Sequence, residues 1–206
     1  MLQRTTCRIV LTVVHSSLLL TAVDLPSPID LAVPLVNQKT ETWCWLAVAQ
    51  MAMQYRNGRS PEQCEMAPVD RASEKLNCCK SPSRCASTGT IEGIQKILSE
   101  AGNLRSAISG PINFGQLYNS IRQGNPVAIA YDSGEQKFHV VIARGMKFYG
   151  TAESITPMVL VNDPMASEPL WIPYKRLQET WTSLLVIGKA ESTKSPRRPL
   201  KSSGID

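Results

Sequence analysis

The hydrophobic pattern of this chain changes near Pro126 from helical spacing to short apolar runs. Before that point, apolar residues recur three and four positions apart, as on the buried face of a helix. After it, β-branched and apolar runs alternate with turn residues, as in strands. Helices followed by strands are typical of an α+β fold, in which a helical lobe packs on an antiparallel sheet lobe. We therefore expect a cleft where the two lobes meet.

Capping residues and turn signals set the limits of the predicted elements. Thr90 is placed to cap one helix, and Asn113 with Gln116 forms a capping box for another. Residues 60–89 are rich in Cys, Pro and Ser and are expected to be irregular. The predicted helices cover 44–57, 91–101 and 113–122, and the predicted strands cover Val127–Tyr131, Phe138–Ala143, Met158–Val161, Leu170–Ile172 and Leu184–Ile187.

The positive charge of the chain lies at its two ends. The net charge is +5 over 206 residues, but residues 1–23 hold two arginines and no acid, and residues 189–206 hold five basic and two acidic residues. Between them, residues 24–188 carry 15 basic and 15 acidic side chains. A nucleic-acid-binding protein is expected to place a basic stripe on its fold, so we predict no nucleic-acid partner.

The composition of the two ends predicts three regions. Residues 1–23 have two arginines before an apolar stretch, which is the order of a signal peptide and is too short and polar for a stable membrane span. Residues 24–188 form the predicted folded domain. Residues 189–206 lack apolar periodicity and are predicted to be a disordered basic tail. We expect a secreted or periplasmic protein; the alternative is a cytoplasmic protein with a mis-assigned start.

Four polar positions could form a catalytic site. Cys44 stands at the start of the first helix, where free N–H groups and the helix dipole favour a thiolate. His139 is the sole histidine of the predicted domain and could hold the thiolate as an ion pair. Asn162 or Asp163, which follow a strand, could orient the imidazole. Gln38 lies six residues before Cys44 and could join its backbone N–H as an oxyanion donor.

This order of residues resembles the papain-like cysteine peptidase superfamily. The matching residues are Gln38 and Cys44, then a lone His139 on a strand, then the Asp163-Pro164 step. The closer similarity is to the compact bacterial branch, which includes effector-type and bacteriocin-processing peptidases. In that branch the third triad member is an Asp in such a step, so the resemblance implies that Asp163, rather than its neighbour, orients the histidine.

The resemblance covers roughly residues 33–187 and implies the papain fold, with the active site in the cleft between the lobes. It implies a cysteine peptidase acting on a peptide or protein substrate, without a cofactor or a metal, and we expect a monomer. The chain departs from plant papains in the Thr42-Trp43 flank and in the Cys/Pro-rich insertion after the first helix. Two alternatives are an acyl transferase or deamidase with the same triad, and a catalytically silent binding module.

The remaining cysteines of the predicted domain are clustered in the insertion, at Cys64, Cys78, Cys79 and Cys85. An even number in a turn-rich segment of an exported protein predicts two disulfides. Because adjacent cysteines rarely bridge each other, Cys64 is expected to pair with Cys78 or with Cys79, and Cys85 with the other. The alternative is a four-cysteine zinc site, but a Cys-Cys doublet does not match the usual ligand spacing.

Overall fold

The structure is a computed structural model that describes residues 25–67, 76–132, 138–151 and 154–189. The predicted signal peptide, residues 1–23, lies outside the described residues, as does the predicted tail apart from Lys189. Within these four ranges, no helix is long and apolar enough to cross a membrane.

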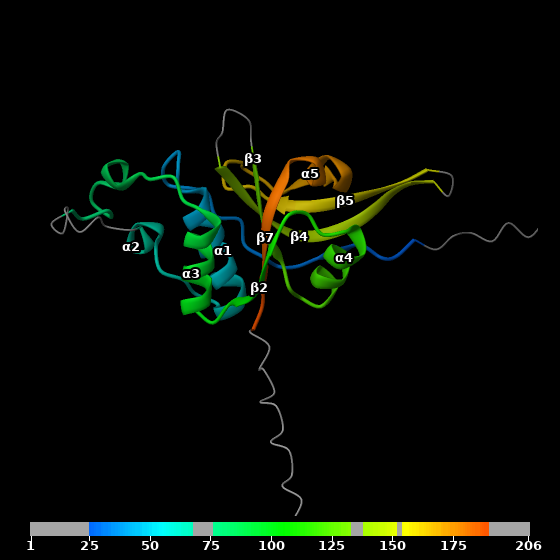
Figure 1. The fold of residues 1–206 in the computed structure, drawn as a ribbon, viewed down its shortest axis with the longest axis horizontal. Coiled ribbons are helices and arrows are strands. Elements are labelled where there is room, and N and C mark those ends of the chain that lie inside the picture. The colour runs from blue at the N-terminus through cyan, green and yellow to red at the C-terminus, as the bar shows by residue number, and fades with distance from the viewer. Residues whose placement is uncertain (1–24, 68–75, 133–137, 152–153, 190–206) are drawn as a thin grey trace, which may run out of the picture.

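An antiparallel sheet forms the centre of the described part of the chain (Figure 1). Its strands lie in the order β2-β7-β3-β4-β5-β6, and β1 pairs with β4. The strands are β1 (Ile29–Asp30), β2 (Leu104–Ser109), β3 (Val127–Asp132), β4 (Phe138–Thr151), β5 (Ser154–Asn162), β6 (Leu170–Pro173) and β7 (Trp181–Ile187).

Helices pack on both faces of this sheet. The helices α1 and α3 lie side by side on one face, and α4 and α5 pack on the other (Figure 1). The helices are α1 (Cys44–Asn57), α2 (Gln63–Met66), α3 (Ile91–Glu100), α4 (Phe114–Arg122) and α5 (Tyr174–Thr180), and a 3₁₀ turn covers Pro82–Cys85. Helices on an antiparallel sheet confirm the predicted α+β class.

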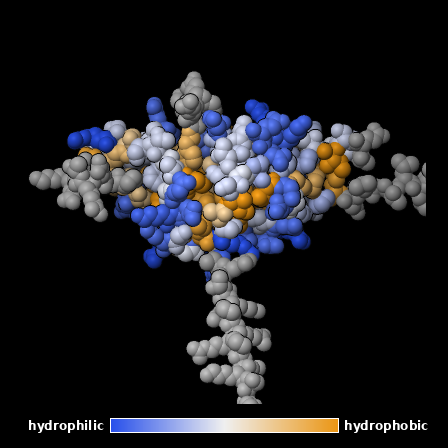
Figure 2. Space-filling model, viewed as in Figure 1, coloured by the Kyte–Doolittle hydropathy of each residue, from blue (hydrophilic) through white to orange (hydrophobic). Residues whose placement is uncertain are grey.

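Alternation along the strands divides the apolar side chains into two cores. On β3, Ala128 faces the core beneath α1 and α3, whereas Val127 and Ile129 face the core beneath α4 and α5. Val140 and Val141 of β4 divide in the same way. A slip of one residue would exchange the two faces, so both cores fix the strand register. The face of the molecule shown in Figure 2 is hydrophilic over much of its area, with hydrophobic residues across its middle.

The helix limits follow the local signals of the sequence. The helix α1 begins at Cys44 as predicted, and Gly58 caps its end with a left-handed φ of 72°. The Thr90 hydroxyl accepts the backbone N–H of Gly93 at 3.2 Å, and Asn113 caps α4 through its side chain. These bonds confirm the predicted helix starts.

Several elements differ from the sequence prediction, among them the short strand β1, and the helix α2 and the 3₁₀ turn in a segment that was expected to be irregular. The strand β2 lies in the half predicted to be helical, and most of its residues are exposed, so it has no apolar run to reveal it. The helix α5 directly follows β6 and was not predicted. The hairpin of β4 and β5 extends well beyond the two predicted apolar runs. Its far end was not predicted, because the residues there are exposed and polar.

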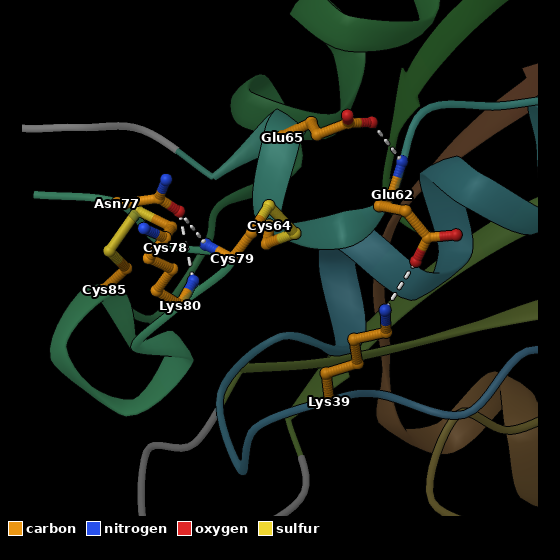
Figure 3. The surroundings of a disulfide bond; sticks show 9 residues. All are labelled: Lys39, Glu62, Cys64, Glu65, Asn77, Cys78, Cys79, Lys80 and Cys85. Carbon is orange, nitrogen blue, oxygen red and sulfur yellow. Dashed lines mark hydrogen bonds and ion pairs between the residues drawn. A yellow bond between two sulfur atoms is a disulfide. The ribbon is translucent and has the colours of Figure 1, made fainter.

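Two disulfides staple the insertion between α1 and α3. Cys64 bonds to Cys79, and Cys78 bonds to Cys85, which is one of the two predicted pairings (Figure 3). The Cα atoms of the pairs lie 4.8 and 5.5 Å apart, within the range that a disulfide spans. All four sulfurs are therefore bonded in pairs, which excludes the alternative zinc site.

Candidate active site

Cys44 is the first residue of α1, and its side chain meets a cavity at the end of the sheet. The cap residue Trp43 makes no side-chain bond to the first turn, and that turn holds no acidic residue, so the positive end of the helix dipole favours an anion there. Cys44 is only 4% exposed, yet it lines a cavity of about 670 Å³. Gln38, His139 and Asp163 line the same cavity, so the structure brings all four candidate residues together.

His139 and Asp163 form a direct hydrogen bond in this cavity. The imidazole Nε2 lies 2.9 Å from Asp163 Oδ1. His139 is the second residue of β4, and Asp163 follows the last residue of β5. Because Ile142 pairs with Asn162 in the register of these strands, the pleat places the next residue, Asp163, on the face that carries His139.

Asn162 points to the opposite face of the sheet and is fully buried. Its Nδ2 donates to the carbonyl oxygens of Val33 at 3.0 Å and Pro34 at 3.2 Å. Asn162 therefore holds the chain segment that leads to Gln38, and Asp163 alone of the two neighbours bonds to the histidine.

The charges of the site stabilise a protonated histidine. Burial alone would lower the pKa of His139, but hydrogen bonds with Asp163 and Cys44, together with their negative charges, raise it to about 9. Burial acts to raise the pKa of Asp163, but the bonds from His139 and from the Met165 N–H hold it below its usual value. Near neutral pH the pair is therefore an imidazolium and a carboxylate. Since Nε2 bonds to the carboxylate, Nδ1 is left to face the thiol.

The backbone of Gln38 is bonded to the turn at residues 163–166, which follows β5 and is called the Asp163 turn below. Its N–H donates to the carbonyl oxygen of Pro164 at 3.1 Å. The side-chain Oε1 is buried and accepts no hydrogen bond from the described residues, and Gln38 lines the cavity. Gln38 and Cys44 thus line the same cavity.

Sequence reasoning missed Tyr131, which packs against the histidine of the site. Tyr131 of β3 pairs with His139 of β4, and the two rings meet edge to face with centroids 5.3 Å apart. Burial, followed by the negative charges of Asp163 and Cys44, raises the pKa of Tyr131 to about 12, so the phenol stays neutral. Only the exact hairpin register could have revealed this pairing. The other missed lining residues are Glu41, Thr42, Thr88, Phe138 and Met165.

The tryptophans that flank the thiol, Trp43 and Trp45, pack inside the helical lobe. They are 0% and 5% exposed, and their indole N–H groups donate to the carbonyl oxygens of Cys85 and Ser87, each at 3.3 Å. A Cβ added at Gly89 would overlap the ring of Trp45, so a glycine is needed there. The insertion therefore supports the start of α1, and both tryptophans act as packing residues.

Comparison with known proteins identifies the family and the fold of the chain. A family model described as the Peptidase_C39 like family matches residues 30–185. The peptidase domain of Streptococcus ComA, a bi-functional ABC transporter involved in quorum sensing, is 18% identical, with a TM-score of 0.51 over 76% of this chain and 98% of that domain. A protein described as a C39-like peptidase from Bacillus anthracis is 14% identical, with a TM-score of 0.53 over 81% of this chain and 100% of that one.

At these identities the two structures establish the fold alone, whereas the family model covers most of the chain. Among curated proteins, none matches the chain significantly. The family match and the shared fold agree with the resemblance found in the order of the polar residues. The chain therefore belongs to the Peptidase_C39 like family of cysteine peptidases and has the papain-like fold.

Proposed function

We propose that this protein hydrolyses peptide bonds through a Cys44-His139-Asp163 triad, with Gln38 and the Cys44 backbone N–H as oxyanion donors. The observation that supports this most directly is the bonded His139–Asp163 pair beside Cys44 in one cavity. A thiol, an imidazole and an orienting carboxylate are the parts that nucleophilic catalysis requires.

In the proposed reaction, the Cys44 sulfur attacks the carbonyl carbon of the substrate and forms a C–S bond. Gln38 and the Cys44 N–H donate to the oxygen as it becomes negative. The imidazolium of His139 gives its proton to the leaving nitrogen, the C–N bond breaks, and the amine departs. His139 then removes a proton from water as the water oxygen attacks the thioester carbon. The C–S bond breaks, the carboxylic acid leaves, and the Cys44 sulfur and the imidazolium of His139 are restored for the next cycle.

Covalent labelling tests whether Cys44 is an activated thiol. Treatment with a peptidyl epoxide should add one label at Cys44 in the native protein, whereas Cys44→Ala should take none at that position. Peptide mapping distinguishes this label from one at Cys7, since the other four cysteines are in disulfides. A native protein that stays unlabelled at Cys44 would support the silent binding module instead.

The raised pKa of His139 predicts the alkaline limb of the pH profile. The imidazole must be protonated to release the amine, so kcat/KM should fall as pH rises through about 9. Protonated His139 also stabilises the folded state. This contribution to the free energy of unfolding is fully present below about pH 6.5, the pKa of histidine in the unfolded chain, and is lost as pH rises through about 9, the pKa in the folded protein. Asp163→Asn removes a negative charge, so the limb should move to lower pH. If the alkaline limb of Asp163→Asn lies at the same pH as that of the wild type, the assignment of this limb to the His139–Asp163 pair is wrong.

We also propose that the protein is exported and that the mature chain begins near Asp24. The two disulfides support this, because such bonds persist in oxidising compartments. The intact mass of protein recovered from the periplasm or medium gives the mature N-terminus. Recovery of the full chain with reduced insertion cysteines from the cytoplasm alone would overturn the proposal.

A further inference from the structure

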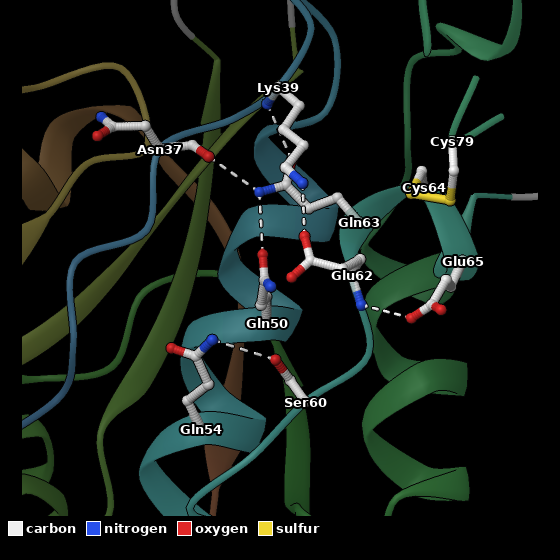
Figure 4. A network of polar contacts seen from close by, with 10 residues as sticks. All are labelled: Asn37, Lys39, Gln50, Gln54, Ser60, Glu62, Gln63, Cys64, Glu65 and Cys79. Carbon is white, nitrogen blue, oxygen red and sulfur yellow. Dashed lines mark hydrogen bonds and ion pairs between the residues drawn. A yellow bond between two sulfur atoms is a disulfide. The ribbon is translucent and has the colours of Figure 1, made fainter. Parts of the chain in front are cut away.

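The side chain of Gln63 is fully buried. It joins the insertion to α1 and to residues 37–39, which we call the Gln38 segment. Its Oε1 accepts the N–H of Lys39 at 2.9 Å. Its Nε2 donates to the carbonyl oxygen of Asn37 at 2.9 Å and to Gln50 Oε1 at 3.1 Å (Figure 4). Both N–H donors of the amide and one lone pair of its oxygen are thus in use.

These bonds hold the backbone on both sides of Gln38. The N–H of Lys39 and the carbonyl of Asn37 are the groups that a neighbouring strand would bind, so the Gln63 amide acts as a short substitute for a strand. From the other side, the Pro164 carbonyl accepts the N–H of Gln38 and the side chain of Asn37. The segment is therefore fixed between the insertion and the Asp163 turn.

A second contact between the insertion and this segment is too exposed to replace Gln63. Lys39 and Glu62 form an ion pair, with side chains that are 48% and 56% exposed. Pairs in such positions contribute little, because water and salt screen them. Gln50, in contrast, is 4% exposed and belongs to α1, the helix that begins at Cys44. The buried contact thus connects the segment of Gln38 with the helix of the thiol.

The position of Gln63 depends on the disulfide bond of the neighbouring residue. The helix α2 is a single turn of four residues, too short to be stable alone. The neighbouring residue, Cys64, is bonded to Cys79, and Glu65 accepts the N–H of Glu62 at 2.8 Å in a capping box. The disulfide and the capping box therefore hold α2, and with it the Gln63 amide, in a fixed position.

We propose that Gln63 is a positioning residue that holds Gln38 in place to donate to the oxyanion. This rests on the proposed function, in which Gln38 is such a donor. Gln63 itself does not line the cavity of Cys44, so its effect must pass through the backbone of the Gln38 segment. A displacement of about 1 Å in a catalytic group can cost on the order of 10² in rate.

Gln63→Met keeps the length of the side chain and removes its hydrogen bonds. We expect kcat on a fluorogenic peptide to fall by about 10- to 100-fold, toward the value for Gln38→Ala, with little change in KM. The matched control is Gln54→Met, because Gln54 bonds to Ser60 of the same insertion at 3.2 Å, whereas the described side-chain bonds from the insertion to the backbone of residues 37–39 come from Gln63. The control should keep kcat within about twofold.

A double-mutant cycle separates this role from general loosening of the fold. In the Gln38→Ala background, Gln63→Met should lower kcat less than about threefold, because the group that it positions is already gone. Affinity for a peptide aldehyde, which forms an oxyanion on Cys44, should fall with kcat. The rate of Cys44 alkylation by iodoacetamide, which forms no oxyanion, should stay near the wild-type rate. Equal losses in both backgrounds would overturn the proposal.

Gln63→Glu provides a second variant if the methionine protein does not fold. The protonated carboxyl can accept from Lys39 and donate once, whereas the carboxylate cannot donate, so the loss of kcat relative to wild type should be larger at pH 8 than at pH 5. A ratio that is independent of pH would overturn the positioning role. The two proposals fail separately: an unaltered kcat in Gln38→Ala contradicts the oxyanion donor, whereas a loss in Gln38→Ala without one in either Gln63 variant contradicts this inference alone.

Discussion

Cys44→Ala should abolish peptide hydrolysis and leave the thermal midpoint nearly unchanged. The substitution removes the atom that forms the acyl-enzyme, and loss of a nucleophile in a related mechanism costs on the order of 10⁶ in kcat. The side chain lost is small, and alanine suits the first position of α1, so little packing is lost. Turnover of a fluorogenic peptide and a thermal melt on the same sample check both parts.

Cys44→Ser is the matched control for geometry, since it keeps a polar atom at the same place but supplies a weaker nucleophile at neutral pH. It should also be nearly inactive while remaining folded. Activity above a few per cent of wild type in folded Cys44→Ala would show that another residue attacks the substrate.

Asp163→Ala should lower turnover by a factor on the order of 10² to 10⁴, the range that a misplaced acid–base partner costs. The reason is the 2.9 Å bond between the carboxylate and Nε2 of His139, which fixes the ring and stabilises its charge. Steady-state kinetics on a small peptide substrate measures the loss, with circular dichroism to confirm the fold.

The neighbouring Asn162 gives a control with the opposite signature. Asn162→Ala removes the donor to the Pro34 carbonyl and one of the two donors to the Val33 carbonyl, which Arg144 also binds at 2.7 Å, and should cost about 1–3 kcal/mol of folding free energy. Turnover in the folded protein should change far less than in Asp163→Ala. If the folded Asn162 variant is the more damaged of the two in kcat, the site follows the plant arrangement and Asp163 is misassigned.

The sequence was most informative where local interactions decide the structure. The start of α1 at Cys44 and the caps Thr90 and Asn113 follow from residues a few positions apart, and the structure has them as predicted. The strand β2 and the helix α5 were missed, because pairing with β7 and packing under the sheet form them rather than an apolar pattern of their own. Exposed ends of β4 and β5 were missed for the same reason.

The candidate site divides along the same line. Gln38, Cys44, His139 and Asp163 could be selected because their residue types and order carry the chemistry, and they do line one cavity. Tyr131 contacts His139 only through the register of β3 with β4, and Gln63 reaches the Gln38 segment only because the insertion folds back on α1. No spacing along the chain marks either contact. The cysteine pairing likewise depended on how α2 places Cys64.

The most direct test of the proposed peptidase activity is incubation of the native protein with an unbiased peptide library, read by mass spectrometry. Cleavage by hydrolysis gives paired fragments whose masses sum to the peptide plus one water, and Cys44→Ala run in parallel should give none. We predict such fragments in the wild-type sample, with the yield falling above about pH 9. A gain of one dalton at glutamine or asparagine would identify a deamidase, and joined peptides would identify an acyl transferase. Either result, without fragments that depend on Cys44, would contradict the assignment as a peptidase.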